Sequence, residues 1–488
     1  MPITKDNLTF TENGAVAYAS TGDECLNFFA RIGGLRDARD DEIVNMYLKA
    51  RAEDKELADS MVLYARNIRE GGIGERSIGR LLLKTLALKD APKVARNLDT
   101  IVAAGRWDDL WALEGTAVET DALAFMKAQF RKDVFAMTDG NTISLLAKWL
   151  PSANTSSKET RRKARKVYTY FGISERVYRK TLSALRKYLN VVEVKMSANE
   201  FDAIEYSAVP SVAMTNYRSA FGRHDFQRFD KYLKAVDRGE AKINASVTYP
   251  YELIRPYTSR VDWSGRLRVD APDPVLEAQW KSLPNYVEGE QDVIVMSDVS
   301  GSMEGHPMDV SISLGLYFAE RNQGPYKDMF MTFTDVPQLY CLDPEDSVLD
   351  RAKEVLQHVG YNTNLNGAFE AVYREAKKVG VAPKALVVIS DGEIDNFLSR
   401  LDRNGTCVDD IIDVWDKKYK AIGLRAPKVI MWNVASRGQK YLGRKGCTGV
   451  SFVSGSSASS FKELTNLIEN DAVTAMLKIL SKPQFQWK

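Results

Sequence analysis

Residues 25–189 repeat apolar and polar positions with the period of an α-helix, whereas residues 1–20 have an irregular or strand-like pattern. Apolar residues recur there at steps of three and four, which places them on one face of each helix. Short turns with Gly and Asp separate the segments, and no strict sequence period is present. The pattern predicts successive helix pairs, as in an α-solenoid. The clearest predicted helices cover residues 42–54, 55–70, 75–90 and 91–105.

The pattern changes after residue 290. Short apolar runs rich in β-branched and aromatic residues alternate there with helical stretches. Strands that are apolar on both faces and alternate with helices predict a parallel sheet that is covered on both sides. The predicted strands cover 292–300, 329–334, 385–392, 428–435 and 449–455, and the predicted helices cover 308–322, 366–380, 406–420 and 459–469.

The two patterns predict an α + α/β protein of two domains. The first is a domain of helical repeats over residues 1–286, which includes a Pro-rich connecting region over 235–286 with a short helix at 273–283. The second is a doubly wound α/β domain over residues 287–488.

Composition narrows the class of protein. The 488 residues are 44% hydrophobic and 27% charged, which is typical of globular proteins and excludes a collagen or a disulfide-stapled mini-domain. The four Cys form no C-x-x-C pair and only three His are present, which argues against a zinc site. Neither a secretory signal pattern nor an apolar run of 18 residues is visible. We therefore expect a soluble cytoplasmic protein.

The first predicted strand of the α/β domain ends in Asp298-Val299-Ser300-Gly301-Ser302. A carboxylate and two hydroxyls at alternate positions point the same way, at the strand end where open sheets bind ligands. Two later residues fit the same site, since Thr363 precedes a predicted helix and Asp391 ends another buried strand. Oxygen ligands of low total charge suit a hard divalent cation, above all Mg²⁺. The alternative interpretation is a turn with a helix N-cap. We expect the nearby His306 to be solvated rather than a ligand.

A second candidate site is the basic segment 158–187. Its thirty residues contain eleven Lys and Arg against two Glu, a net charge of +9. Such a surface attracts phosphates, and interleaved aromatic residues, if exposed, can stack on single-stranded bases. The alternative is an amphipathic helix whose aromatics are core and whose charges are solvated. The aromatic residues are Tyr168, Tyr170, Phe171 and Tyr178.

Signatures of enzymatic chemistry are weak. Gly71-Gly72-Ile73-Gly74 follows no strand and precedes no Lys-Ser/Thr, so it is not a P-loop. No G-x-S-x-G motif has plausible His and Asp partners, and no general base is evident for a metal-dependent hydrolase. We therefore expect no enzymatic activity and no nucleotide cofactor.

The order Asp-x-Ser-x-Ser, loop Thr, strand-Asp-Gly resembles a von Willebrand factor A domain with its metal-ion-dependent adhesion site. The resemblance implies that Ser300 and Ser302 coordinate the cation directly. It implies that Thr363 binds directly or through water, and that Asp298 and Asp391 bind mainly through water. An acidic side chain of a protein ligand would complete the coordination.

Six further motifs lie in the first half of the chain. They are NIREGGIGER (67–76), GRWDDLW (105–111), LLAKWLPS (145–152), VYRKTLSALRK (177–187), VVEVKMSANEFDAIEYSAVPSVAM (191–214) and RHDFQRFDKYL (223–233). These motifs look like an uncharacterised family found in plants, fungi, bacteria and viruses. That family is similar to the TROVE module of the Ro autoantigen, in which HEAT-like helical repeats close into a ring joined to a von Willebrand A domain.

The resemblance implies binding of small structured noncoding RNA or of the single-stranded ends of misfolded RNA. By analogy, the cations of segment 158–187 would contact phosphates. They are Lys158, Arg161, Arg162, Lys163, Arg165, Lys166, Arg176, Arg179, Lys180, Arg186 and Lys187.

Two functions remain open at this point. The first is a non-enzymatic, Ro-like RNA-binding scaffold with a divalent-metal ligand site. The second is a metal-dependent protein interaction or assembly module, in which the basic segment is incidental. In neither case do we expect a membrane partner.

Overall fold

The computed structural model describes residues 8–69, 71–259, 269–287, 292–333, 336–358, 364–394, 408–438 and 440–488. The chain divides into two compact units. One contains residues 1–78 and 245–486, and the other contains residues 79–244 with 487–488. The predicted division at residue 286/287 follows the change in sequence pattern and stays a prediction. The compact units differ from it because the first 78 residues belong with the sheet.

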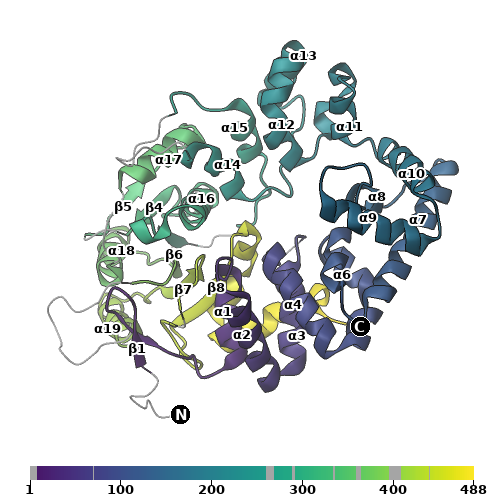
Figure 1. The fold of residues 1–488 in the computed structure, drawn as a ribbon. Coiled ribbons are helices and arrows are strands. Elements are labelled where there is room, and N and C mark those ends of the chain that lie inside the picture. Colours follow the sequence, from purple (N-terminus) through teal and green to yellow (C-terminus); the bar gives the residue numbers. More distant parts are fainter. Residues whose placement is uncertain are drawn as a thin grey trace. The chain divides into compact units, whose positions relative to one another are not determined.

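The first unit is built on a six-stranded sheet in the order β5-β4-β3-β6-β7-β8 (Figure 1). The expected α + α/β layout is therefore present at the level of helices and strands, but the sheet is mixed rather than parallel. A strand that the sequence did not predict, β5, pairs antiparallel with β4 at the edge, and the other pairs are parallel. The strands are β3 (Val293–Ser297), β4 (Met329–Thr332), β5 (Leu339–Cys341), β6 (Ala385–Ser390), β7 (Lys428–Asn433) and β8 (Val450–Ser454).

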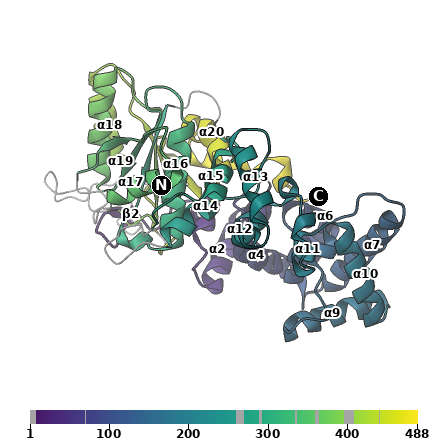
Figure 2. The same ribbon diagram turned by 90° about the horizontal axis from the view of Figure 1, so that it is seen from above.

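Helices cover both faces of this sheet (Figures 1 and 2). α16 (His306–Arg321) connects β3 to β4, and α19 (Val408–Ala421) connects β6 to β7 in the opposite direction along the sheet. Because both crossovers are right-handed, the two helices lie on opposite faces. Gly315 lets α16 approach β3 closely, since a Cβ there would lie 2.2 Å from Ser297 Oγ.

The first residues of the chain form part of the α/β unit. The hairpin of β1 (Leu8–Phe10) and β2 (Val16–Tyr18) is tied to the segment after β7 by two backbone hydrogen bonds between Tyr18 and Tyr441, at 2.8 and 2.9 Å. Gly33 packs against the end of β8, where its N–H donates to Ser454 Oγ at 3.0 Å. A Cβ at Gly33 would lie 2.4 Å from the backbone nitrogen of Gly455, so only glycine fits.

The remaining elements of this unit are helical. They are α1 (Glu24–Arg31), η2 (Ile32–Gly34), α2 (Asp40–Glu53), α3 (Lys55–Arg66), α14 (Pro250–Thr258), α15 (Pro274–Lys281), η6 (Gly301–Met303), α17 (Val348–Gln357), α18 (Leu365–Val379), η7 (Ala458–Glu463), α20 (Leu464–Glu469), α21 (Ala472–Leu480) and η8 (Pro483–Phe485).

The second unit is helical throughout its described residues. Helices α7, α9 and α10 lie side by side in both views (Figures 1 and 2), and α8 packs against α7 and α10. The predicted helix at 91–105 is two helices that meet at the buried Asn97. The elements are α5 (Ala91–Arg96), α6 (Leu98–Ala104), η3 (Trp107–Leu113), α7 (Glu119–Thr138), α8 (Leu146–Trp149), α9 (Lys158–Phe171), α10 (Glu175–Tyr188), α11 (Val192–Ser197), η4 (Phe201–Ala203), η5 (Tyr206–Ala208), α12 (Ser211–His224) and α13 (Phe226–Asp237), and α4 (Arg76–Lys89) begins before the boundary between the units.

No helix in the described part of the chain is both long enough and apolar enough to span a membrane.

Candidate functional sites

Two of the predicted metal ligands lie at the ends of neighbouring strands. Asp298 follows β3 and Asp391 follows β6, and these strands pair in parallel with Ser297 opposite Ile389. The Asp298 N–H continues the ladder by donating to the Ile389 carbonyl at 3.0 Å. The sheet therefore brings the two aspartates to one edge, as the sequence predicted. Thr363, a further predicted ligand, lies outside the described residues.

The two hydroxyls of the motif lie next to each other in the loop that follows Asp298. Ser300 Oγ and Ser302 Oγ are 3.1 Å apart. Asp298 is held in place by two neutral donors: its Oδ1 accepts from the Ser300 N–H at 3.0 Å, and its Oδ2 accepts from Ser390 Oγ at 2.6 Å. Asp298 thus orients the loop that carries the two serines. Ser390 was not among the predicted residues, although its place directly before Asp391 could have suggested it.

The carboxylates of Asp298 and Asp391 are buried, and one of their four oxygens accepts no hydrogen bond from the described residues. Asp298 is 0% and Asp391 is 3% exposed. Burial, and then the charge of Asp391, raises the pKa of Asp298 to about 6. Asp391 Oδ1 accepts from the Glu393 N–H at 3.0 Å, but its buried Oδ2 accepts no hydrogen bond from the described residues. Positive charge placed between the two carboxylates would therefore be strongly favoured.

The hydroxyl spacing fits a hard divalent cation. Two adjacent ligands of an octahedral Mg²⁺, each about 2.1 Å from the ion, lie about 3 Å apart. The Ser300–Ser302 oxygen separation of 3.1 Å matches that edge. Among the described residues, no group of three or more His, Cys, Asp or Glu side chains could hold a metal ion. The candidate set is of another kind, since it combines two carboxylates with hydroxyls.

The loop that carries Asp391 is fastened from two sides. Glu393 Oε1 pairs with Lys440 Nζ at 2.7 Å, and its Oε2 accepts from the Glu12 N–H. Thr11 Oγ1 donates to the Ile394 carbonyl at 2.6 Å. The turn between β1 and β2 therefore helps to position one of the candidate ligands. The local sequence does not indicate this contribution, because the partners are more than 380 residues apart.

His306 does not have the solvated environment that the sequence suggested. It begins α16, and its pKa is lowered to about 3 by burial and by the charges of Arg36 and Arg255. Arg255 Nη2 lies 2.6 Å from His306 Nδ1, and Ser456 Oγ lies 3.2 Å from Nε2. Because a guanidinium can only donate, Nδ1 accepts and the neutral ring carries its proton on Nε2. His306 then donates to Ser456 and does not act as its base.

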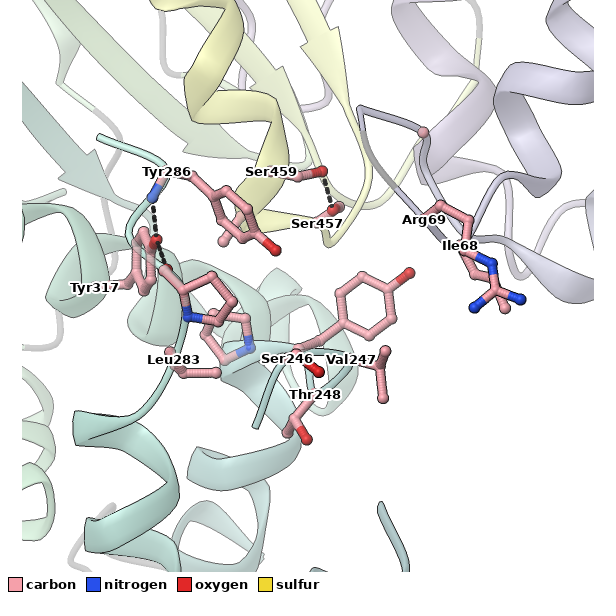
Figure 3. Close-up of a pocket in the computed structure, with 15 residues that line it drawn as sticks. Ile68, Arg69, Ser246, Val247, Thr248, Leu283, Tyr286, Tyr317, Ser457 and Ser459 are labelled. Carbon is pink, nitrogen blue, oxygen red and sulfur yellow. Dashed lines mark hydrogen bonds between the residues drawn. The ribbon is translucent and has the colours of Figure 1, made fainter. Parts of the chain in front are cut away.

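A hollow of about 420 Å³, open to solvent, lies in the α/β unit (Figure 3). Its walls come from Ile68, Arg69, Gly72, segment 246–250, Leu283, Pro284, Tyr286, Tyr317 and segment 457–459. Several of its polar groups bond to one another: Ser457 Oγ lies 2.7 Å from Ser459 Oγ, and Tyr317 Oη donates to the Pro284 carbonyl at 2.6 Å. Both hydrogen bonds lie within the α/β unit, and we assign no ligand to the hollow.

The predicted basic segment forms two helices of the second unit, α9 and α10. Phe171 is 5% and Tyr178 is 0% exposed, and Tyr178 Oη donates to the Pro151 carbonyl at 2.7 Å. Tyr170 Oη reaches the Thr120 carbonyl at 3.3 Å, and the half-buried Tyr168 packs against Tyr178 at 6.0 Å between ring centroids. Base stacking on Phe171 or Tyr178 is therefore excluded, because both rings belong to the core between the helices.

Several cations of the segment already have partners. Lys166 Nζ lies 2.5 Å from carboxylate oxygens of both Glu114 and Glu119. Arg162 bonds to Glu114 and Glu159, and its hydrogen bonds hold the pKa of Glu114 at about 2. The others with partners are Arg161 with the carbonyls of Thr155 and Ser156, Lys163 with Glu159, Arg179 with Glu175, and Arg186 with Ser152 Oγ and the carbonyls of Ala147 and Leu150.

The other five cations are exposed, and within the described part of the chain their side chains have no hydrogen bond or ion pair. Those of α10 follow each other at steps of four and seven residues, so they share one face of that helix. The two of α9 are seven residues apart and share a face in the same way. The five are Lys158, Arg165, Arg176, Lys180 and Lys187.

Comparisons with known proteins match two families to different parts of the chain. Residues 144–290 match a family described as a domain of unknown function, DUF2828. Residues 292–476, which include the whole six-stranded sheet, match a second one, DUF7788. The chain is also 29% identical over 517 residues to the uncharacterized protein L728 of Acanthamoeba polyphaga mimivirus, covering 97% of this chain and 87% of the viral protein.

Proposed function

We propose that the protein is a non-enzymatic RNA-binding scaffold that also carries a divalent-cation site for a ligand. The observation that carries the RNA part is the set of five exposed cations on α9 and α10 whose side chains have no partner among the residues that the structure describes. A cation without a partner can bind a phosphate directly, whereas a cation in an ion pair must first give up the free energy of its contact with the carboxylate. The ligand would be single-stranded or misfolded RNA, contacted mainly through its backbone, because Phe171 and Tyr178 are withdrawn into the core.

The test compares two triple variants that remove the same charge. R176Q/K180Q/K187Q neutralises the shared face of α10, and K377Q/K417Q/K445Q neutralises three exposed lysines of the α/β unit. Fluorescence anisotropy with a labelled RNA hairpin that has a single-stranded tail gives affinities at several salt concentrations. The α10 variant should lower the salt slope by about 2, at about 0.7 per lost contact with a single strand. No binding by the wild type at low salt, or equal losses in both variants, would refute the proposal.

The finer assignment of the fold belongs to this proposal. The α/β unit would be a von Willebrand A-like domain and the helical unit a TROVE-like array of HEAT-like repeats that closes into a ring. The placement of Asp298 and Asp391 at the ends of β3 and β6 supports the first part. The fully helical character of residues 79–244 supports the second.

The second candidate function is metal-dependent capture of a protein partner. Three observations favour it: Asp298 and Asp391 are buried at the ends of paired strands, Asp391 Oδ2 accepts no hydrogen bond from the described residues, and the hydroxyls of Ser300 and Ser302 are paired. Mg²⁺ bound there would retain open positions for water or for an acidic side chain of the partner. In an assembly module of this kind, RNA binding would be absent.

Nuclease and chelator separate the two functions. A partner retained after RNase treatment, released by EDTA, and not bound by the Asp298→Ala variant would favour metal-dependent capture. Glu304→Gln, a change of an exposed acid six residues further on, is the matched control and should retain the partner. A complex that RNase releases and EDTA leaves intact would instead favour the RNA-binding scaffold.

A further inference from the structure

A guanidinium lies beside the candidate metal site on its solvent side. Arg437 comes from the segment after β7, and its Nη2 donates to the Ser302 carbonyl at 2.5 Å. Its Nε lies 3.6 Å from Asp391 Oδ2, the oxygen that accepts no hydrogen bond. The Arg437 side chain is 45% exposed while that of Asp391 is 0% exposed. The guanidinium therefore spans from the serine loop to the buried carboxylate and borders solvent.

This contact supplies the charge that the site otherwise lacks. Within the described ranges, the hydrogen bonds to the Asp298 carboxylate come from the neutral donors Ser300 and Ser390, and its charge repels that of Asp391. Among the described residues, Arg437 is the cation that forms an ion pair with either carboxylate, since Lys440 is paired with Glu393 instead. A divalent cation would compete with the guanidinium for Asp391 Oδ2, and the two positive charges would repel each other.

We infer that Arg437 is a built-in counter-cation that covers the divalent-cation site and turns away when the site takes up Mg²⁺ and a ligand carboxylate. This inference rests on the proposed cation site and adds a regulator to it. A long, half-exposed side chain can leave by changing rotamers, without movement of the backbone. The Ser302 carbonyl then bonds to water, and the solvent side of the site is open to an acidic ligand.

Calorimetric titration of Mg²⁺ into EDTA-stripped, dialysed full-length protein tests the inference. Arg437→Gln should bind Mg²⁺ at least about fivefold more tightly than the wild type, because one competing charge is removed. Arg437→Lys keeps the charge but loses the two-pronged contact and should fall between them. Lys445→Gln removes an exposed charge from the same connection between β7 and β8, and should change the affinity less than twofold.

Thermal melting of the same variants is a second, independent test of the inference. Without metal, Arg437→Gln should melt at a lower temperature than the wild type, since the buried carboxylates lose their counter-charge. Saturating Mg²⁺ should remove most of that difference. Adding Asp298→Asn to Arg437→Gln should abolish the tight binding, which shows that the heat comes from this site.

The outcomes separate the inference from the cation site itself. Equal or weaker Mg²⁺ binding by Arg437→Gln, with normal binding by the wild type, overturns the cover and leaves the cation site standing. If Arg437→Gln binds Mg²⁺ and the wild type does not, Arg437 blocks the cation site completely in the wild type, which supports the inference. Absence of binding in every variant overturns the cation site and the inference together.

Discussion

At the scale of single residues, Asp298 links the candidate metal site to stability. Its pKa is raised from 3.8 to about 6, chiefly by burial and then by Asp391. Below pH 3.8 the carboxyl is neutral in both the folded and the unfolded chain. As the pH rises towards 6 and beyond, the unfolded chain releases this proton first, so the free energy of unfolding falls. The loss for metal-free protein is about 3 kcal/mol once Asp298 is ionised.

This predicts a pH-dependent gain for Asp298→Asn. The oxygen of the amide can still accept from the Ser300 N–H, its nitrogen can donate to Ser390 Oγ in a reversed hydrogen bond, and the side chain carries no charge. Relative to the wild type in EDTA, the variant should become more stable by about 3 kcal/mol between pH 4 and pH 7.5. Urea unfolding at the two pH values measures the difference. A stability difference between the two proteins that is independent of pH would contradict the buried, repelled carboxylate.

Arg186 and Lys187 are neighbours in α10 with opposite surroundings. Arg186 donates to the buried carbonyls of Ala147 and Leu150 at 2.9 and 2.7 Å, and burial lowers its pKa. Arg186→Ala strands these acceptors, and should lower the free energy of unfolding by about 3 kcal/mol. Lys187→Ala should change it by less than about 0.5 kcal/mol, because Lys187 is exposed.

The order of the two variants should be reversed for RNA affinity: Lys187→Ala should lower it more than Arg186→Ala. Lys187→Ala should weaken binding by about twofold to fivefold at low salt, while folded Arg186→Ala should bind as the wild type does. Denaturant unfolding and RNA anisotropy on both variants check the pair. A larger loss of affinity in Arg186→Ala would mean that the side chain leaves its carbonyl partners to contact RNA.

The same two residues show what the sequence could predict at this scale. Charge density along 158–187 identified the basic surface, but it treated all eleven cations alike. Which of them is bonded depends on partners such as Glu114 and the Ala147 carbonyl, far along the chain. Arg437 was missed for the same reason, since nothing in its own loop indicates the carboxylate of Asp391.

At the scale of elements, the β1–β2 turn supports the loop that carries Asp391. Thr11 Oγ1 donates to the buried Ile394 carbonyl at 2.6 Å and accepts from the Ala15 N–H at 2.8 Å. Thr11→Val removes both bonds, and should cost about 1–3 kcal/mol and weaken Mg²⁺ binding a few-fold. Hydrogen exchange should accelerate at residues 391–394. Thr9→Val on the neighbouring strand is the control, and equal acceleration in it would contradict the role of the turn.

Local pattern predicted most elements because periodicity is a local property. The apolar runs located β3, β4, β6, β7 and β8, and the three- and four-residue steps located α2, α3 and α4. The three-residue strand β5 is half-exposed and carries too few positions to show a pattern. Hairpin β1–β2 joins the sheet region through bonds to Tyr441 and Ile394, and such distant partners leave no mark on local sequence.

At the scale of the whole molecule, the two candidate sites belong to different compact units. The free cations of α9 and α10 lie in residues 79–244, and Asp298, Asp391 and Arg437 lie in the unit that contains the sheet. The hydrogen bonds and ion pairs described for the metal residues, with Ser390, Ser300 and Glu393, stay within their own unit. The sites therefore share none of these bonding partners.

We accordingly expect RNA binding and cation binding to be thermodynamically independent. Asp298→Asn should leave RNA affinity within about twofold, R176Q/K180Q/K187Q should leave Mg²⁺ affinity unchanged, and the combined variant should be additive within about 0.5 kcal/mol. A double-mutant cycle on both affinities measures the coupling. A coupling free energy above about 1 kcal/mol would contradict independence, and by linkage would require RNA and Mg²⁺ to change each other's affinity by the same factor. The scaffold would then be one in which occupation of the cation site reports on bound RNA.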